Sequence, residues 1–206
     1  MREIERTPIH HVVRHVKAAV NRLLYRPRGV KLGFNSGVRR PFHWFGGRYV
    51  FVGANTMILP HSRIEAIDSW SGEHFQPRIE LGEGVYIGRY LYITAINGVS
   101  IGDLCVLSDH VYITDEFHGT HPDRGPIMEQ PLESKGPVEI GRSCFLGYRC
   151  AIMPGVTLGN HCLVGAHSIV THSFPDNSMI AGNPARLIKT YVPQSGRWET
   201  PNSRDD

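Results

Sequence analysis

The feature that most constrains this chain is a six-residue repeat that runs unbroken from Val138 to Val170. Every sixth position is aliphatic: Ile140, Leu146, Ile152, Leu158, Val164 and Val170. A small residue usually follows four positions later, as at Cys144, Cys150, Cys162 and Ser168. Neither strand alternation nor the helical repeat produces a strict period of six. The period predicts a chain wound round a triangular prism, one hexad per face, with the aliphatic residue pointing inward and a glycine allowing the bend at the corner.

The same spacing recurs earlier in the chain, in sets of three. The sets are Val52, Ile58 and Ile64; Leu81, Ile87 and Ile93; and Ile101, Leu107 and Ile113. With two further sets from 140 to 170, we expect an all-β fold of about five coils. Each interruption follows the third hexad of a coil, so all insertions should leave the prism at one corner. Insertions confined to one face of a repeat array usually build its binding face.

The longest insertion, residues 114–137, is rich in groups that can carry chemistry. It contains Asp115, Glu116, His118 and His121. A loop of this length without regular structure is usually functional or disordered. We therefore expect the active-site loop here, within a β-helix domain spanning residues 30–180.

The ends of the chain differ from the repeat. Residues 1–29 carry an apolar stripe at helical spacing with basic residues among it, which predicts an amphipathic helix and a linker. That helix either packs on the protein or a neighbouring subunit, or lies on a membrane surface. Residues 30–48 read as an irregular strand or cap, and residues 181–206 as a C-terminal cap and tail.

Composition narrows the possible functions. The formal charge of +3 comes without a Lys/Arg-rich block, so nucleic acid is not expected as a partner. The four cysteines, Cys105, Cys144, Cys150 and Cys162, all occupy the small-residue position of a hexad, which favours buried fillers over disulfides or a metal site. Reduced thiols, no apolar stretch long enough to span a membrane and no signal-peptide pattern lead us to expect a cytoplasmic protein.

Three further segments carry a family resemblance: residues 154–159 (PGVTLG), 164–171 (VGAHSIVT) and 181–186 (AGNPAR). Together with the hexads, they resemble the hexapeptide-repeat acyltransferases, in particular the galactoside, maltose and polysaccharide O-acetyltransferases. The resemblance implies a left-handed parallel β-helix, a homotrimer, and acetyl-CoA as co-substrate in the groove between subunits. It also implies direct acetyl transfer to a hydroxyl of a sugar or glycan precursor.

The resemblance assigns the catalytic base to His118, where the family's catalytic histidine begins the loop. A neutral imidazole near physiological pH can take the proton of an attacking hydroxyl. Asp115 and the His118-Gly119 pair match the pattern of the polysaccharide enzymes, so we include Asp115 in the catalytic set. Either Asp115 or Glu116 is expected to orient His118 through its other ring nitrogen. The cysteines face inward, so a covalent acyl-enzyme is not expected.

The donor and acceptor sites are predicted less directly. Small residues let an extended pantetheine arm approach the backbone, and cations suit nucleotide phosphates. Small size favours Gly147, Ala166 and Ser168 beside this arm, with Phe145 as an aromatic wall. The resemblance implies that Ala166, Thr171, Arg186 and Lys189 contact coenzyme A. Phe145 stands where the family usually has Trp. Thr94 stands where the galactoside enzymes have an acceptor-binding Asn, and His121 is a second candidate acceptor contact.

Three alternative functions stay open from the sequence. The first is an N-acetyltransferase acting on an amino sugar, which needs the same base and donor site. The second is a zinc enzyme like the gamma-type carbonic anhydrases, with His110, His118 and His121 as the ligands, although their spacing is poor for zinc. The third is a scaffold without catalytic activity.

Overall fold

The computed structural model describes residues 29–200 and the isolated position Val16. The helix predicted for residues 1–29, and with it the question of a membrane contact, lies almost wholly outside these described residues. Within them, no helix has the length and apolar character needed to cross a membrane.

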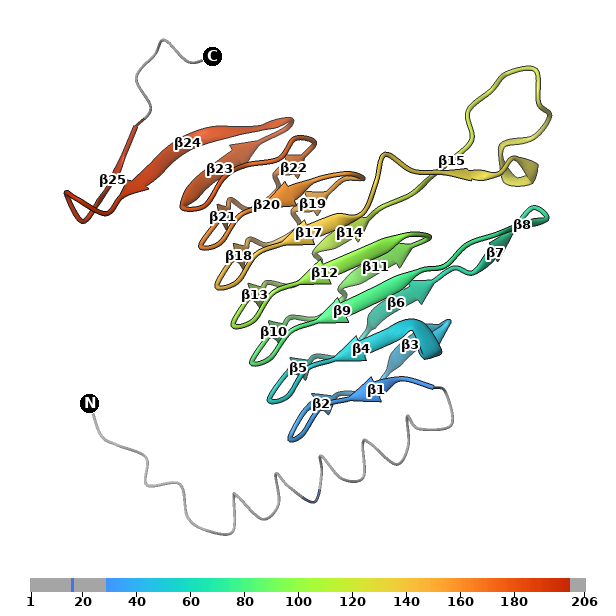
Figure 1. The fold of residues 1–206 in the computed structure, drawn as a ribbon, viewed down its shortest axis with the longest axis horizontal. Coiled ribbons are helices and arrows are strands. Elements are labelled where there is room, and N and C mark those ends of the chain that lie inside the picture. Colours follow the sequence, from blue (N-terminus) through green and yellow to red (C-terminus); the bar gives the residue numbers. More distant parts are fainter. Residues whose placement is uncertain (1–15, 17–28, 201–206) are drawn as a thin grey trace.

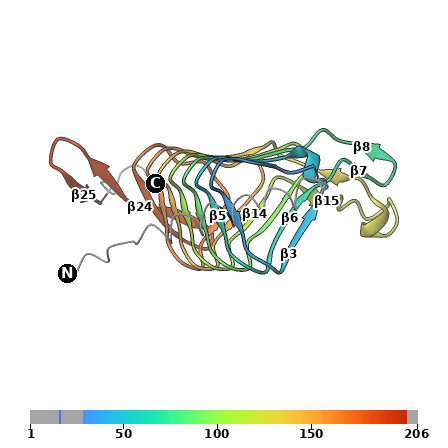
Figure 2. The same cartoon turned by 90° about the horizontal axis from the view of Figure 1, so that it is seen from below.

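Three sheets form the faces of a prism (Figures 1 and 2), and their strands are parallel except for β24 and β25, which join sheet B antiparallel at its end; this confirms the predicted all-β winding. Sheet A contains β1 (Lys31–Leu32), β4 (Val50–Val52), β9 (Arg78–Leu81), β12 (Gly98–Ile101), β17 (Val138–Ile140) and β20 (Thr157–Leu158). Sheet B contains β2 (Gly37–Val38), β5 (Met57–Ile58), β10 (Tyr86–Ile87), β13 (Val106–Leu107), β18 (Phe145–Leu146), β21 (Leu163–Val164), β23 (Ser178–Gly182), β24 (Ala185–Val192) and β25 (Arg197–Glu199). Sheet C contains β3 (Phe42–Phe45), β6 (Ser62–Ala66), β11 (Tyr92–Ala95), β14 (Tyr112–Thr114), β19 (Ala151–Ile152) and β22 (Ile169–Val170).

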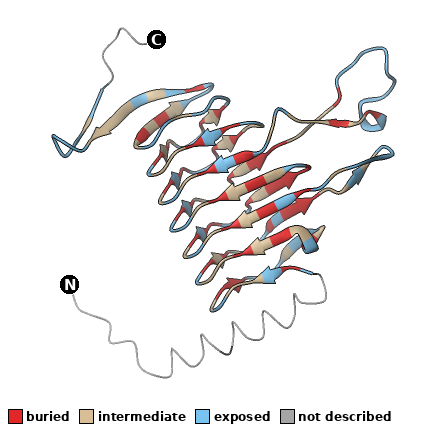
Figure 3. Cartoon of the chain, in the orientation of Figure 1, coloured by how far each residue is buried: buried red, intermediate tan, exposed pale blue. Residues whose placement is uncertain are grey.

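The hexad aliphatics pair in register from coil to coil and are buried. Figure 3 shows buried positions recurring on the strands of successive coils. On sheet B, Ile58, Ile87 and Leu107 are directly paired, and none of the three is exposed to solvent. Burying each such side chain contributes roughly 1.5–3 kcal/mol. The four cysteines are free and buried beside these residues, as predicted.

Residues 30–48 form a complete additional coil, β1 to β3, so the prediction of an irregular strand or cap was wrong. Leu32, Val38 and Trp44 are six residues apart and pair with Val52, Ile58 and Ile64 of the next coil. The six-residue repeat of this coil is hard to recognise in the sequence for two reasons. A Trp occupies the third inward position, and a short 3-10 helix, η2 (Gly47–Tyr49), separates this coil from the next.

The corner glycines are required for a different reason from the one predicted. A Cβ on Gly82 would lie 2.7 Å from the backbone nitrogen of Asp103, and one on Gly102 would lie 2.7 Å from that of Arg142. Glycine therefore lets the backbones of successive coils approach each other. The left-handed turn position nearby is taken by ordinary residues such as Leu104 (φ 60°) and Ser143 (φ 56°).

The insertions all leave between sheet C and sheet A, as predicted. After β6 comes the hairpin of β7 (Ser69–Trp70) and β8 (Glu73–His74); after β14 comes the long loop with β15 (Phe117–His118), η3 (Ile127–Glu129) and β16 (Leu132–Glu133). Both project from the same side of the prism, whereas β24 and β25 project from the opposite side (Figures 1 and 2).

Candidate active site

His118 lies on β15, at the base of the long loop. Its backbone pairs with Leu132 of β16, and the N–H of Gly119 donates to the carbonyl of Pro131 at 2.9 Å. The side chain is half-buried, and its Nδ1 atom is buried without a hydrogen-bond partner. The two-residue strand fixes where the imidazole leaves the backbone, while no polar contact in the described chain fixes the ring itself.

The Asp115 carboxylate binds backbone N–H groups rather than the His118 ring, so its predicted role in orienting His118 stays a prediction. The side chain is fully buried, and its oxygens accept the backbone N–H groups of Ile96 at 2.9 Å, Asn97 at 2.8 Å and Gly98 at 2.5 Å. These contacts hold the tight turn between β11 and β12. Burial raises the pKa of Asp115, and the three backbone donors partly offset this effect.

Thr94 lies on the outer face of sheet C, where the loop begins. It is buried and donates from Oγ1 to Oε1 of Glu116 at 3.1 Å. In the same row Glu65 pairs with Thr94 across the coils, and its carboxylate accepts from Tyr92 at 2.9 Å. Burial, followed by this hydrogen bond, raises the pKa of Tyr92 to about 12. The hydroxyl of Thr94 therefore already donates a hydrogen bond within the chain. A ligand bound at this face would meet Glu116 and Tyr92 as well as Thr94.

His121 lies farther along the loop and is exposed, with Nε2 3.8 Å from a carboxylate oxygen of Glu133. Its backbone is fixed by Gln130, which is only 2% exposed. The Gln130 amide accepts from the N–H of His121 and donates to its carbonyl, both at 2.9 Å, and also donates to the carbonyl of Gly125. A single buried amide thus closes the outer part of the loop.

The hairpin β7–β8 brings Trp70 against His118, a contact that sequence reasoning missed. The two ring centroids are 5.3 Å apart at 66°, an edge-on arrangement. The indole Nε1 donates to the carbonyl of Gln130 at 3.1 Å. The repeat predicts that the two insertions leave the prism at the same corner. It does not predict that they meet each other across the short turn of the coil between them.

Most predicted donor residues lie at sheet B or its corner with sheet C, away from His118. Phe145 faces outward from sheet B and is 42% exposed. A Cβ on Gly147 would lie 2.6 Å from the backbone nitrogen of Ala166, so these two positions stack tightly. Thr171 follows β22 at the loop's corner, where its Oγ1 lies 2.9 Å from Nδ1 of His172. A single chain does not bring the donor set and His118 together.

Ser168 is unavailable as a side-chain contact for the donor. It is fully buried, and its hydroxyl accepts the backbone N–H of Gly182 at 3.1 Å. It therefore fills the small-residue position of the hexad and anchors the turn that begins at Gly182.

Arg186 and Lys189 stand on β24, opposite Ala181 and Met179 of β23. Arg186 is exposed, and neither cation forms an ion pair with any described residue. Two unneutralised cations on one strand suit an anionic group such as a phosphate.

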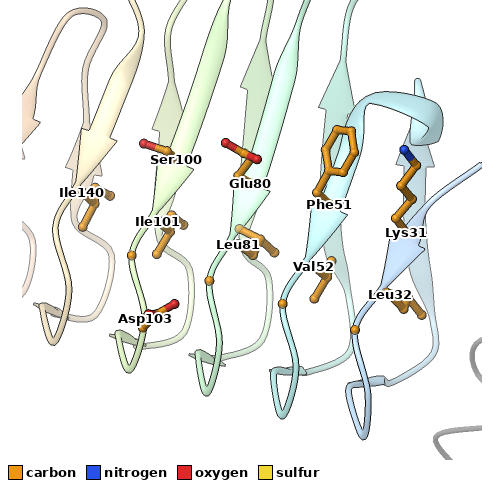
Figure 4. Close-up of a pocket in the computed structure, with 14 residues that line it drawn as sticks. Lys31, Leu32, Phe51, Val52, Glu80, Leu81, Ser100, Ile101, Asp103 and Ile140 are labelled. Atoms are coloured by element: carbon orange, nitrogen blue, oxygen red, sulfur yellow. The ribbon is translucent and has the colours of Figure 1, made fainter.

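A groove of 590 Å³ crosses the outer face of sheet A (Figure 4). Phe51, Glu80 and Ser100 contribute to its lining, and none of the predicted site residues does. The Phe51 ring is flanked by Lys31 at 4.7 Å and by Arg78 at 4.3 Å. The groove is thus separate from the loop that carries His118.

The histidines proposed as zinc ligands do not come together in one chain. His110 lies at the corner between sheets B and C, stacked on Tyr90 at 4.6 Å, whereas His118 and His121 lie on the loop. Within residues 29–200 no three His, Cys, Asp or Glu side chains are grouped as metal ligands.

Comparison with known proteins agrees with this architecture. Residues 137–172 match the family described as Bacterial transferase hexapeptide (six repeats). Over 128 residues, 59% of this chain and 65% of the relative, the sequence is 35% identical to the putative lipopolysaccharide biosynthesis O-acetyl transferase WbbJ of Escherichia coli K12. It is 32% identical to the galactoside O-acetyltransferase of the same organism over 52% of this chain and 55% of the relative. The chain thus spans less than two thirds of the length of these relatives.

A solved structure shares the fold. A single-residue mutant of AntD, an N-acyltransferase from Bacillus cereus crystallised with dTDP and coenzyme A, superposes with a TM-score of 0.69. The match covers 84% of this chain and 90% of AntD at 20% identity. The winding and these matches together define a hexapeptide-repeat β-helix. The resemblance to the sugar O-acetyltransferases is confirmed: the chain carries the hexapeptide repeat and is similar in sequence to these enzymes over part of their length.

Proposed function

We propose that this protein is an acetyl-CoA-dependent O-acetyltransferase that transfers an acetyl group directly to a hydroxyl of a sugar or glycan precursor. The observation that carries the proposal is the position of His118. It begins an ordered loop at the single corner from which the insertions leave, on a fold whose sequence relatives are O-acetyltransferases.

His118 acts as the general base in this proposal. Its Nδ1 atom is buried, so Nε2 is the nitrogen that takes the proton from the acceptor hydroxyl as its oxygen attacks the thioester carbon. The coenzyme A thiolate leaves as the acetyl group moves to the acceptor oxygen. A positioned base contributes about 10²–10⁴-fold to such a reaction.

The donor site is completed by a second subunit. Arg186 and Lys189 bind the nucleotide phosphates, and the pantetheine arm follows the backbone at Gly147 and Ala166, with Phe145 and Thr171 beside it. Because most of these residues lie at sheet B or its corner with sheet C, whereas His118 lies at the corner between sheets C and A, one chain supplies the base and its neighbour supplies most of the donor site. We propose a left-handed β-helix assembled as a homotrimer, located in the cytoplasm and acting in polysaccharide biosynthesis.

The acceptor binds at the outer face of sheet C, near Thr94 and His121. Glu116 and Tyr92 present further oxygens to sugar hydroxyls there. An N-acetyltransferase acting on an amino sugar would use the same base and donor site, and it stays the second candidate.

The experiment that tests the function is an acceptor screen with acetyl-CoA, in which the free thiol of released coenzyme A is measured. We expect thiol release above the rate in water with at least one hydroxylated sugar, and an acetyl ester in the product by mass spectrometry. An amide product would establish the N-acetyltransferase instead. No release with any hydroxyl or amine acceptor would contradict both.

A further inference from the structure

The hairpin β7–β8 is the second insertion at the active-site corner, and the proposed mechanism does not use it. It leaves sheet C two coils before the long loop. The intervening coil returns to sheet A by the short turn that Asp115 holds. Because that turn is short, the hairpin and the loop project past it and meet. Figure 1 shows both extending from the same side of the prism.

Two hydrogen bonds join the hairpin to the loop. The Nε1–H of Trp70 donates to the carbonyl of Gln130, and the hydroxyl of Ser71 donates to the carbonyl of Glu129. Gln130 is itself held by its side-chain bonds to the backbone of His121. The indole is therefore fixed on the loop that carries His118.

The imidazole of His118, in contrast, lacks a polar tether within the described chain. Its Nδ1 atom is buried and unpaired. Its defined ring contact is the edge-on one with Trp70, at 5.3 Å and 66°. An edge-on aromatic pair has a preferred geometry, so the indole restricts the rotation of the imidazole about its last side-chain bond.

We propose that Trp70 is a positioning residue for His118: the indole, held by the carbonyl of Gln130, sets the direction in which the catalytic ring nitrogen points. This inference rests on the proposed function. A base displaced by about 1 Å can cost about 10²-fold in rate, so an aromatic contact remote from the thioester can control turnover.

The test compares Trp70→Leu, which removes the ring, with Trp70→Phe, which keeps a ring but no N–H donor. Trp198→Leu is the matched control, because Trp198 lies on β25 against Tyr191 at 5.6 Å. With acetyl-CoA and a galactoside as the probe acceptor, we expect Trp70→Leu to lower kcat about 10- to 100-fold. The KM for acetyl-CoA should stay within about two-fold. Trp70→Phe should recover only part of kcat, because it keeps a ring beside His118 but loses the hydrogen bond to the carbonyl of Gln130. Trp198→Leu should match the unchanged protein.

A readout without turnover keeps the inference separate from the proposed function. In protein labelled at histidine with ¹³C and ¹⁵N, the His118 ring signals, assigned from their loss in His118→Ala, should shift in Trp70→Leu as the indole ring current disappears. They should move less in Trp70→Phe and stay fixed in Trp198→Leu. Unshifted His118 signals in a folded Trp70→Leu protein would overturn the proposal, as would an unchanged kcat per folded molecule. If the unchanged protein transfers no acetyl group, the proposed function fails, and the ring signals alone decide whether Trp70 orients His118.

Discussion

The carboxylate of Asp115 accepts the backbone N–H of Asn97 at 2.8 Å, across two neighbouring coils of the prism. Ile96 and Gly98 donate to the same carboxylate, so a residue from the active-site loop secures the turn of the preceding coil. Asp115, which was predicted to orient His118, therefore stabilises the architecture of the corner.

We expect Asp115→Ala to lower the free energy of unfolding by about 2–4 kcal/mol, because three buried N–H groups lose their acceptor. Urea denaturation measures this change. Asp123→Ala, at an exposed position of the same loop, is the control and should change stability by less than about 0.5 kcal/mol. If Asp115→Ala were as stable as the unchanged protein but slow in turnover, Asp115 would belong to the catalytic set after all.

Arg186→Ala should raise the KM for acetyl-CoA about three- to ten-fold and leave kcat nearly unchanged, because an exposed cation facing a phosphate contributes mainly to donor binding. Steady-state kinetics with acetyl-CoA varied gives both constants. Arg197→Ala, on β25, is the control. A lower kcat at normal donor affinity would remove Arg186 from the donor site.

A site shared between subunits predicts recovery of activity in mixed trimers. His118→Ala removes the base, and Ala166→Trp blocks the donor arm on the exposed corner beside Gly147. The two inactive variants are unfolded and refolded together in equal amounts. About a quarter of the subunit interfaces should then pair the intact His118 of an Ala166→Trp chain with the intact donor site of a His118→Ala chain. Activity should rise accordingly, and mixtures without any recovery would place the whole site in one chain.

The buried cysteines should resist alkylation in the folded protein. All four thiols are buried, so iodoacetamide cannot reach them in the folded protein. Burial also raises the pKa of Cys150 to about 12, so its reactive thiolate is scarce at pH 8. We expect intact mass spectrometry to show no addition of iodoacetamide to the native protein and four additions after denaturation. Rapid alkylation of Cys150 in the native state would contradict its inward position.

Much of the fold was predictable because the repeat is written directly into the sequence. Inward positions of a coil are mostly aliphatic because they fill the prism, so Ile101, Leu107 and Ile113 predict three faces from the sequence. The first coil escaped prediction because its third inward residue, Trp44, is aromatic. It is still buried, at 8% exposure, which shows that the position requires apolar volume rather than an aliphatic shape.

The site was less predictable, because sequence order does not reveal which side chains meet. His118 could be chosen from its place in the loop. Trp70, however, reaches it from a separate insertion, and the partners of Asp115 are backbone N–H groups that any sequence would supply. Contacts between insertions depend on the length of the turn in the coil between them. That length can be judged only when the pairing of the strands is known.

The most direct test of the account is the turnover of His118→Ala with acetyl-CoA and a sugar acceptor, measured by release of free thiol. If His118 is the general base, kcat should fall by at least about 10²-fold, with a KM for acetyl-CoA close to that of the unchanged protein. Undiminished turnover in a folded His118→Ala protein would contradict the assignment of the base, and with it the mechanism proposed for this corner of the prism.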